Sequence, residues 1–144
     1  ANVFVAQFLG SPKMNVLPGT ARSSNGGVHI GGTGANFTLP AVDIDAALTG
    51  RLGQVAQLGI RPESLTVSAG ASAEPGWQAR IDVIEHLGDT VLVYASVAGV
   101  EQPVSLKLSA EDGAPWQVGM TVNLHPKAGA LHLFDAHGQR LGAI

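Results

Sequence analysis

Short runs of alternating apolar and polar residues fill the second half of this 144-residue chain. In the clearest run, residues 91–97, every second residue is apolar, so one side of an extended strand would be apolar. The same alternation recurs at 104–108, 122–124 and 131–133. Turn-forming residues separate these runs at intervals of about ten positions, a spacing typical of β-barrels and β-sandwiches. The sequence therefore predicts an all-β fold.

The composition is that of a folded domain rich in turns. The chain has 19 glycines, about twice the usual share, and 45% of its residues are hydrophobic. It contains no cysteine, which excludes disulfides and thiolate chemistry. The formal net charge of −3 and the scattered basic residues argue against nucleic-acid binding. No apolar run is long enough to span a bilayer, and the beginning lacks the pattern of a signal peptide.

In the first half we expect short strands and two helices. Phe4 and Phe8 are four residues apart, which favours a short N-terminal helix over residues 4–9, and Pro12 would stop it. Ile44, Leu48 and Leu52 recur at a spacing of four and predict a second helix over 41–52. Strands are expected at 14–17, 28–30, 37–39 and 55–60.

In the second half the strongest local prediction is a hairpin. Its strands are 81–87 and 90–98, joined by the turn pair Gly88–Asp89. The small, polar residues 68–76 predict a loop that divides the chain into two fused barrel-like halves, about 1–68 and 77–144. Apolar strands that end at a proline occur in both halves, which is consistent with two related barrels or with coincidence.

No motif for catalysis or cofactor binding is complete. Gly32–Thr33–Gly34 begins a G-x-G-x-x-G pattern, but Phe37 stands where the third glycine is needed. No Gly-Lys-Ser/Thr, Leu-Ser-Gly-Gly-Gln or G-x-S-x-G occurs, and the five histidines lack metal-ligand spacing, although His132 and His137 flank a predicted turn. We therefore expect no catalytic, cofactor or metal site in this chain.

Four segments carry a resemblance to a known family. They are FVAQFLGSPKMN (4–15), LGIRPE (58–63), VIEHLG (83–88) and LHLFD (131–135). In this order they resemble the C-terminal regulatory domain, of TOBE/OB type, in the ATP-binding subunit of maltose- and glycerol-phosphate-type ABC importers, which take up carbohydrates. The resemblance implies OB-like barrels with a short N-terminal helix and one further short helix. Because the chain begins on Ala, in the middle of a motif, we expect a piece of a longer protein without its ATPase domain.

The resemblance also implies a function. The chain would be a non-catalytic regulatory and dimerisation domain that holds paired ATPase subunits together at the cytoplasmic side of the plasma membrane. ATP and magnesium would bind in the absent ATPase domain. The implied partners are a second copy, the membrane subunits of the transporter and a cytoplasmic regulatory protein. Residues 20–53 match no family pattern, and the transported solute stays open.

The family-motif residues are the candidates for an interface: Phe8, Gly10, Ser11, Pro12, Met14, Asn15, Gly59, Arg61, Pro62, Glu63, Glu85, Gly88 and Phe134. Arg61 and Glu63 could form a structural ion pair or face a partner. Phe134 is either a core residue or lies near a subunit contact. Trp77 and Trp116 follow turn residues and either cover the mouth of a barrel or anchor an interface.

An alternative function is small-ligand sensing. A related barrel in oxyanion importers binds molybdate or tungstate, and backbone amides around 31–36 could form an anion nest. The four segments match the sugar-importer type better. Binding of molybdate, sulfate or sugars to the isolated chain would separate a sensor from a dimerisation module.

Overall fold

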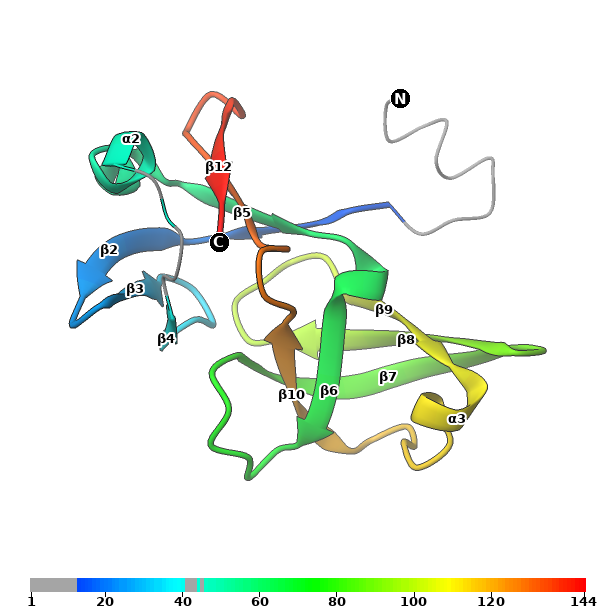
Figure 1. The fold of residues 1–144 in the computed structure, drawn as a ribbon. Coiled ribbons are helices and arrows are strands. Elements are labelled where there is room, and N and C mark those ends of the chain that lie inside the picture. Colours follow the sequence, from blue (N-terminus) through cyan, green and yellow to red (C-terminus); the bar gives the residue numbers. More distant parts are fainter. Residues whose placement is uncertain (1–12, 41–43, 45) are drawn as a thin grey trace.

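The computed structural model describes residues 13–40, 44 and 46–144 (Figure 1). The predicted N-terminal helix and the candidates Phe8, Gly10, Ser11 and Pro12 lie outside the described residues. The strands of the first half are β1 (Asn15–Pro18), β2 (Thr20–Ser24), β3 (Gly27–Gly31), β4 (Phe37–Pro40), β5 (Gln57–Ile60) and β6 (Leu65–Ala69). Those of the second half are β7 (Trp77–Leu87), β8 (Thr90–Val97), β9 (Val104–Ser109), β10 (Thr121–Pro126), β11 (His132–Phe134) and β12 (Arg140–Ala143).

These strands form three antiparallel sheets. The four-stranded sheet has the order β1-β5-β11-β12, the five-stranded sheet β6-β10-β7-β8-β9, and the three-stranded sheet β2-β3-β4. The four-stranded sheet therefore combines strands from the two ends of the chain, with β11 between β5 and the C-terminal β12. Figure 1 shows β12 (red) in the same part of the molecule as the blue β1 and the green β5. The predicted all-β fold of OB-like barrels is confirmed.

The core contains the apolar side chains that alternation assigned to one side of each strand. Leu17, Leu58 and Leu133 lie side by side in the register of β1, β5 and β11, and all three are buried. Trp77 is 1% exposed and packs edge-on against Phe37, with ring centroids 4.9 Å apart. This contact joins the five-stranded sheet to β4 of the three-stranded sheet. Trp77 is thus a core residue, which agrees with the packing alternative for this residue and not with the interface alternative.

Several elements differ from the predictions. The predicted helix over 41–52 is described only as α2 (Ala46–Thr49), followed by a 3-10 turn, η1 (Leu52–Gln54). Gly50 follows α2 and Gly53 lies within η1. The Arg51 N–H bonds to the Leu48 carbonyl three residues earlier, a tighter spacing than an α-helix has. The apolar stripe therefore marked a buried side, with Leu48 and Leu52 in the core, but not one continuous helix.

Short elements with weak patterns were missed. The polar strand β2 and the glycine-containing β12 have few apolar residues, and the helix α3 (Ala110–Gly113) has only four residues. Strand β6 extends to Ala69, so the loop predicted over 68–76 begins later than expected. The hairpin of β7 and β8 and its turn at Gly88–Asp89 are confirmed. No helix among the described residues is long and apolar enough to cross a membrane.

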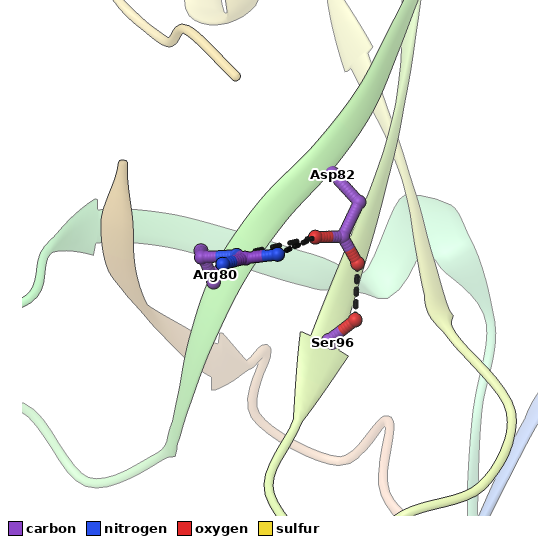
Figure 2. A network of polar contacts seen from close by, with 3 residues as sticks. All are labelled: Arg80, Asp82 and Ser96. Atoms are coloured by element: carbon purple, nitrogen blue, oxygen red, sulfur yellow. Dashed lines mark hydrogen bonds and ion pairs between the residues drawn. The ribbon is translucent and has the colours of Figure 1, made fainter. Parts of the chain in front are cut away.

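A β-bulge interrupts the pairing of β7 with β8. Ile81 pairs with Ala95 and Val83 with Tyr94, so Asp82 is the extra residue. Figure 2 shows its carboxylate between Arg80, whose Nη2 lies 3.2 Å from Oδ1, and the Ser96 hydroxyl. The hydrogen bond from Ser96 is the main cause that lowers the pKa of Asp82. This network holds the bulge on the solvent side of the hairpin.

Candidate interaction face

The register of the four-stranded sheet brings motif residues from three segments onto one side. Gly59 on β5 pairs with Val16 on β1 and with His132 on β11. Val16, Gly59 and His132 thus form one row across the sheet. Since successive side chains alternate between the two sides of a sheet, the residue two positions before or after each of them along the chain lies on the same side. We call this side the outer face and define it by Met14, Val16, Gly59, Arg61, His132, Phe134 and Arg140.

Gly59 is the centre of the outer face. A Cβ atom at this position would lie 2.7 Å from Met14 Sδ and 2.7 Å from Phe134 Cε2. Because glycine has no side chain, Met14 and Phe134 can cover the backbone of β5 from its two sides. Three of the predicted candidates, from three separate segments, therefore meet at one place.

The centre of the outer face is apolar and partly open to solvent. Val16 is 52% exposed on the edge strand β1, and Met14 and Phe134 are half-buried. Phe134 is thus a surface residue of this sheet rather than a core residue. Exposed apolar side chains that adjoin a glycine-flattened strand suit a contact with another protein surface.

A basic corner adjoins the apolar centre. Arg140 Nε donates a hydrogen bond to His132 Nδ1 at 3.1 Å. Partial burial lowers the pKa of His132 below its ordinary value of 6.5, and the charges of Arg140 and then of Arg61 lower it further. His132 is therefore neutral at pH 7, and it lies within electrostatic range of both arginines.

Arg61 and Glu63 are not ion-paired with each other. Within the described part of the chain the salt bridge found joins Arg80 to Asp82, so the structural ion pair suggested for Arg61 and Glu63 is not present. Pro62 is buried and begins the 3-10 turn η2 (Pro62–Ser64), and the charged residues before and after it are exposed. The Glu63 carbonyl oxygen accepts a hydrogen bond from Lys127 Nζ at 2.9 Å.

Asn15 points to the inner side and links two sheets. Its Nδ2 donates to the Ser105 carbonyl oxygen at 2.9 Å, and its Oδ1 accepts from the Ser105 N–H at 2.8 Å and from the Ser105 hydroxyl at 3.1 Å. Both residues are buried, and Ser105 belongs to β9 of the five-stranded sheet. The Asn15 side chain therefore links the two sheets and is buried between them.

Glu85 and Gly88 lie on the β7–β8 hairpin, outside the outer face. Gly88 has a φ of 78°, a left-handed conformation that glycine adopts readily in a tight turn. Glu85 is exposed and lies near Tyr94, whose pKa is raised by burial and then by the Glu85 charge. In the VIEHLG motif, Gly88 thus forms the turn of this hairpin and Glu85 lies on its exposed surface.

Sequence reasoning missed three members of the outer face: Val16, His132 and Arg140. His132 was considered only as a metal ligand with His137, and the described residues contain no cluster of three or more His, Asp or Glu side chains suited to a metal. Alternation within 14–17 and 131–134 was a usable signal for Val16 and His132. Arg140 follows a turn and had no such signal.

Comparisons with known proteins identify the family of the chain. Residues 58–134 match the model of the TOBE domain, and residues 10–65 match that of the MalK OB fold domain. The chain belongs to the TOBE domain family. The two matched regions overlap over residues 58–65. This overlap contains most of β5, the turn η2 and the start of β6, and so includes Arg61, Pro62 and Glu63.

Relatives of this TOBE chain are ATP-binding proteins of importers. The sn-glycerol-3-phosphate import ATP-binding protein UgpC of Chromohalobacter salexigens is 38% identical over 98% of this chain and 35% of that protein. The alpha-glucoside transport ATP-binding protein AglK of Rhizobium meliloti is 32% identical over 96% of the chain and 36% of the relative. The lactose transport ATP-binding protein LacK of Rhizobium radiobacter is 33% identical, with 97% and 38% covered. The chain thus spans about a third of the length of these relatives.

A solved structure shows the same fold at low identity. The cytoplasmic molybdate-binding protein ModG, crystallised with molybdate, superposes with a TM-score of 0.58 at 15% identity. The match covers 83% of this chain and 94% of the ModG chain. It supports the fold of the TOBE chain and carries no argument about its ligand.

Proposed function

We propose that this chain is the regulatory and dimerisation domain of the ATP-binding subunit of a carbohydrate-importing ABC transporter. The domain itself is non-catalytic. In the complete protein, ATP and magnesium bind in a separate ATPase domain, and the subunit works at the cytoplasmic side of the membrane with the membrane subunits of the importer. Support comes from the relatives, which match over nearly the whole chain and are ATP-binding subunits for glycerol phosphate, alpha-glucosides and lactose.

The outer face is the proposed contact between two copies. Its apolar centre at Val16, Met14 and Phe134 would be removed from water when two such faces meet, and this burial supplies the driving force. The neutral state of His132 lowers the positive charge beside the centre at pH 7, which favours the approach of two identical faces. The convergence of Met14, Gly59 and Phe134 on this face is the observation that carries the proposal.

A lasting contact between regulatory domains would change how the ATPase domains meet. When two subunits stay tethered, closure around ATP becomes an intramolecular step with a high effective concentration. A cytoplasmic regulator that binds one arrangement of the tethered pair more tightly would shift the cycle towards that arrangement. The domain would thus act on transport without touching ATP.

Light scattering of the chain across a dilution series tests this proposal. We expect a mass near twice 14.7 kDa at micromolar concentration. Val16→Asp should weaken the dimer by about tenfold or more, since it places a charge in the apolar contact. Val118→Asp is the matched control, because Val118 is 62% exposed and lies outside the outer face. A monomer at all concentrations, or equal effects of the two variants, would overturn the role of this face.

A further inference from the structure

A cavity of about 640 Å³ lies at the open seam of the five-stranded sheet. The strands β6 and β9 are the two edges of this sheet, and both border the cavity. The turn η2, the β7–β8 turn and α3 complete its walls. Its charged and aromatic lining residues are Glu63, Asp89, Lys107, Asp112, Trp116 and Lys127. We call it the seam cavity.

The seam cavity touches the backbone edges of both strands. It is lined by three consecutive residues of β6, 65–67, and three of β9, 107–109. Consecutive residues point to opposite sides of a strand, so only the edge of the strand can present all three. In an antiparallel edge strand about half of the N–H and C=O groups point away from the paired neighbour. Strand β6 pairs with β10 and β9 with β8, so these edges offer backbone hydrogen-bond groups to a ligand.

The walls around these edges are well packed. The Ser109 hydroxyl accepts a hydrogen bond from the Asp112 N–H at 3.0 Å and caps α3. At Gly113 a Cβ atom would lie 2.8 Å from Val91 Cβ, which shows how closely α3 approaches β8. On the other side, Lys127 Nζ is held by the Glu63 carbonyl oxygen. The cavity is therefore preformed rather than made by loose loops.

The lining carries both signs of charge. The lining includes two lysines, Lys107 and Lys127, and three acidic residues, Glu63, Asp89 and Asp112, so its formal charge is −1. The Lys107 ammonium and the carboxylates of Glu63 and Asp112 have no hydrogen-bond partner among the residues that the structure describes. The cavity thus offers free donors and free acceptors together.

This mixture selects the chemistry of the ligand. A hydroxyl group can donate to a carboxylate and accept from an ammonium or a backbone N–H, so a molecule with several hydroxyls satisfies both kinds of group. The slightly negative lining disfavours an anion such as phosphate or molybdate. Trp116 Nε1 is already bonded to the Asp112 carbonyl oxygen at 3.0 Å, so its ring contributes apolar surface.

We propose that the seam cavity is a binding site for a neutral polyhydroxylated small molecule, a sugar or a polyol. Lys107, Asp112 and the edges of β6 and β9 hold its hydroxyl groups, and Trp116 contacts its carbon skeleton. The volume of the cavity is in the range of small-molecule sites, which is about 300–1,000 Å³. The site lies on the other sheet from the outer face and does not depend on dimerisation.

Titration calorimetry with the chain tests the site directly. The neutral probes are glucose, maltose and glycerol, and the anionic probes are inorganic phosphate, sn-glycerol 3-phosphate and molybdate. We expect saturable binding of at least one neutral probe and no tighter binding of any anionic probe. Amide chemical shifts in NMR spectra should change at 65–67 and 107–109 and leave those of Val16 and Gly59 unchanged.

Charge-neutralising variants locate the binding. Lys107→Gln and Asp112→Asn should each weaken the affinity for the neutral probe by about fivefold or more, since each removes one charged hydrogen-bond partner. Lys13→Gln and Glu101→Gln are the matched controls at exposed positions outside the cavity and should change the affinity by less than about twofold.

Three results would overturn the proposal. The first is that no neutral probe saturates the site at concentrations up to roughly 10 millimolar, beyond which an affinity is too weak to matter. The second is that an anionic probe binds more tightly than every neutral probe. The third is that Lys107→Gln and Asp112→Asn both leave the affinity unchanged. Light scattering of the same samples reports the dimer separately. A failed sugar site with an intact dimer, or the reverse, therefore distinguishes this inference from the proposed function.

Discussion

The outer face and the seam cavity present two different kinds of surface. The outer face consists of alternate residues on and beside β1, β5 and β11 and of Arg140 on β12, with apolar side chains around a glycine. The seam cavity consists of consecutive residues from β6 and β9, with charged side chains around two strand edges. The side of a sheet suits another protein surface, whereas an open edge flanked by polar groups suits a small molecule with hydroxyls.

The turn η2 lies between the two surfaces. Arg61 precedes it on the outer face, Glu63 lines the seam cavity, and Pro62 is buried between them. The three residues of one motif therefore face three different surroundings. A motif of adjacent residues in a β protein need not describe one site, because neighbouring side chains point in different directions.

The largest effect is expected from a variant that weakens the contact between the two sheets that carry these surfaces. Asn15→Ala removes three hydrogen bonds to Ser105 and leaves buried backbone groups without partners. We expect a loss of about 3 kcal/mol in the free energy of unfolding, measured with urea. Asn36→Ala, at an exposed position, is the control and should cost less than about 0.5 kcal/mol. Equal costs would show that Asn15 does not hold the sheets together.

A second variant tests the wall of the seam cavity. In Gly113→Ala the new methyl group would meet Val91, whose β-branched side chain has little freedom to move. Overpacking typically costs about 1–3 kcal/mol, and a methyl group against a stiff side chain belongs at the upper end of that range. The gain in helix propensity offsets about 1 kcal/mol, so we expect a loss of about 2 kcal/mol. Urea unfolding measures it. A neutral or stabilising effect would mean that α3 is more loosely packed than the structure shows.

The same change at the centre of the outer face should cost less. In Gly59→Ala the methyl group meets Met14 Sδ and the edge of the Phe134 ring, and the Met14 side chain can turn away. We expect a loss of about 1 kcal/mol and a weaker dimer by light scattering. Gly53→Ala is the control, since nothing lies within 4 Å of its added atom. If Gly59→Ala cost more than Gly113→Ala, the side chains around Gly59 would be less able to move than Val91 beside Gly113, which is the reverse of what we expect.

The smallest effect concerns the charge of the outer face. Arg140→Gln should raise the pKa of His132 towards 6.5, since the Arg140 charge is the second cause of its lowering after burial. Because the pKa is lower in the folded chain, the unfolded chain binds more protons just below pH 6.5. The free energy of unfolding contributed by His132 is therefore complete above that pH and falls as the pH decreases through the folded pKa.

NMR titration of the His132 ring measures this shift. Arg22→Gln, an exposed arginine on β2, is the control and should leave the His132 titration unchanged. A His132 pKa that does not respond to Arg140→Gln would mean that burial alone lowers it. Light scattering at pH 7.5 and at mildly acidic pH would then show whether protonation of His132 opposes the dimer, as the proposed contact requires.

Much of the fold was predictable because alternation survives in the longer strands. The hairpin of β7 and β8, the strands β9 and β10, and the residues Met14, Gly59 and Phe134 were all named from sequence. The weak strands β2 and β12 were missed, since pairing with a neighbour compensates for their few apolar residues. Among the described residues, the helix predicted over 41–52 extends too far at its C-terminal end, because periodicity marks the buried side but does not show that the α-helix ends before Gly50.

The sequence by itself determined the class of fold, the family and the residues that face the core, because these depend on local alternation and on motif letters. Only the tertiary structure decided which residues meet. Asn15 bonds to a serine 90 positions away, and the seam cavity is lined by edges of strands that are far apart in the chain. Such contacts are set by strand order and register, and no local pattern encodes either of them.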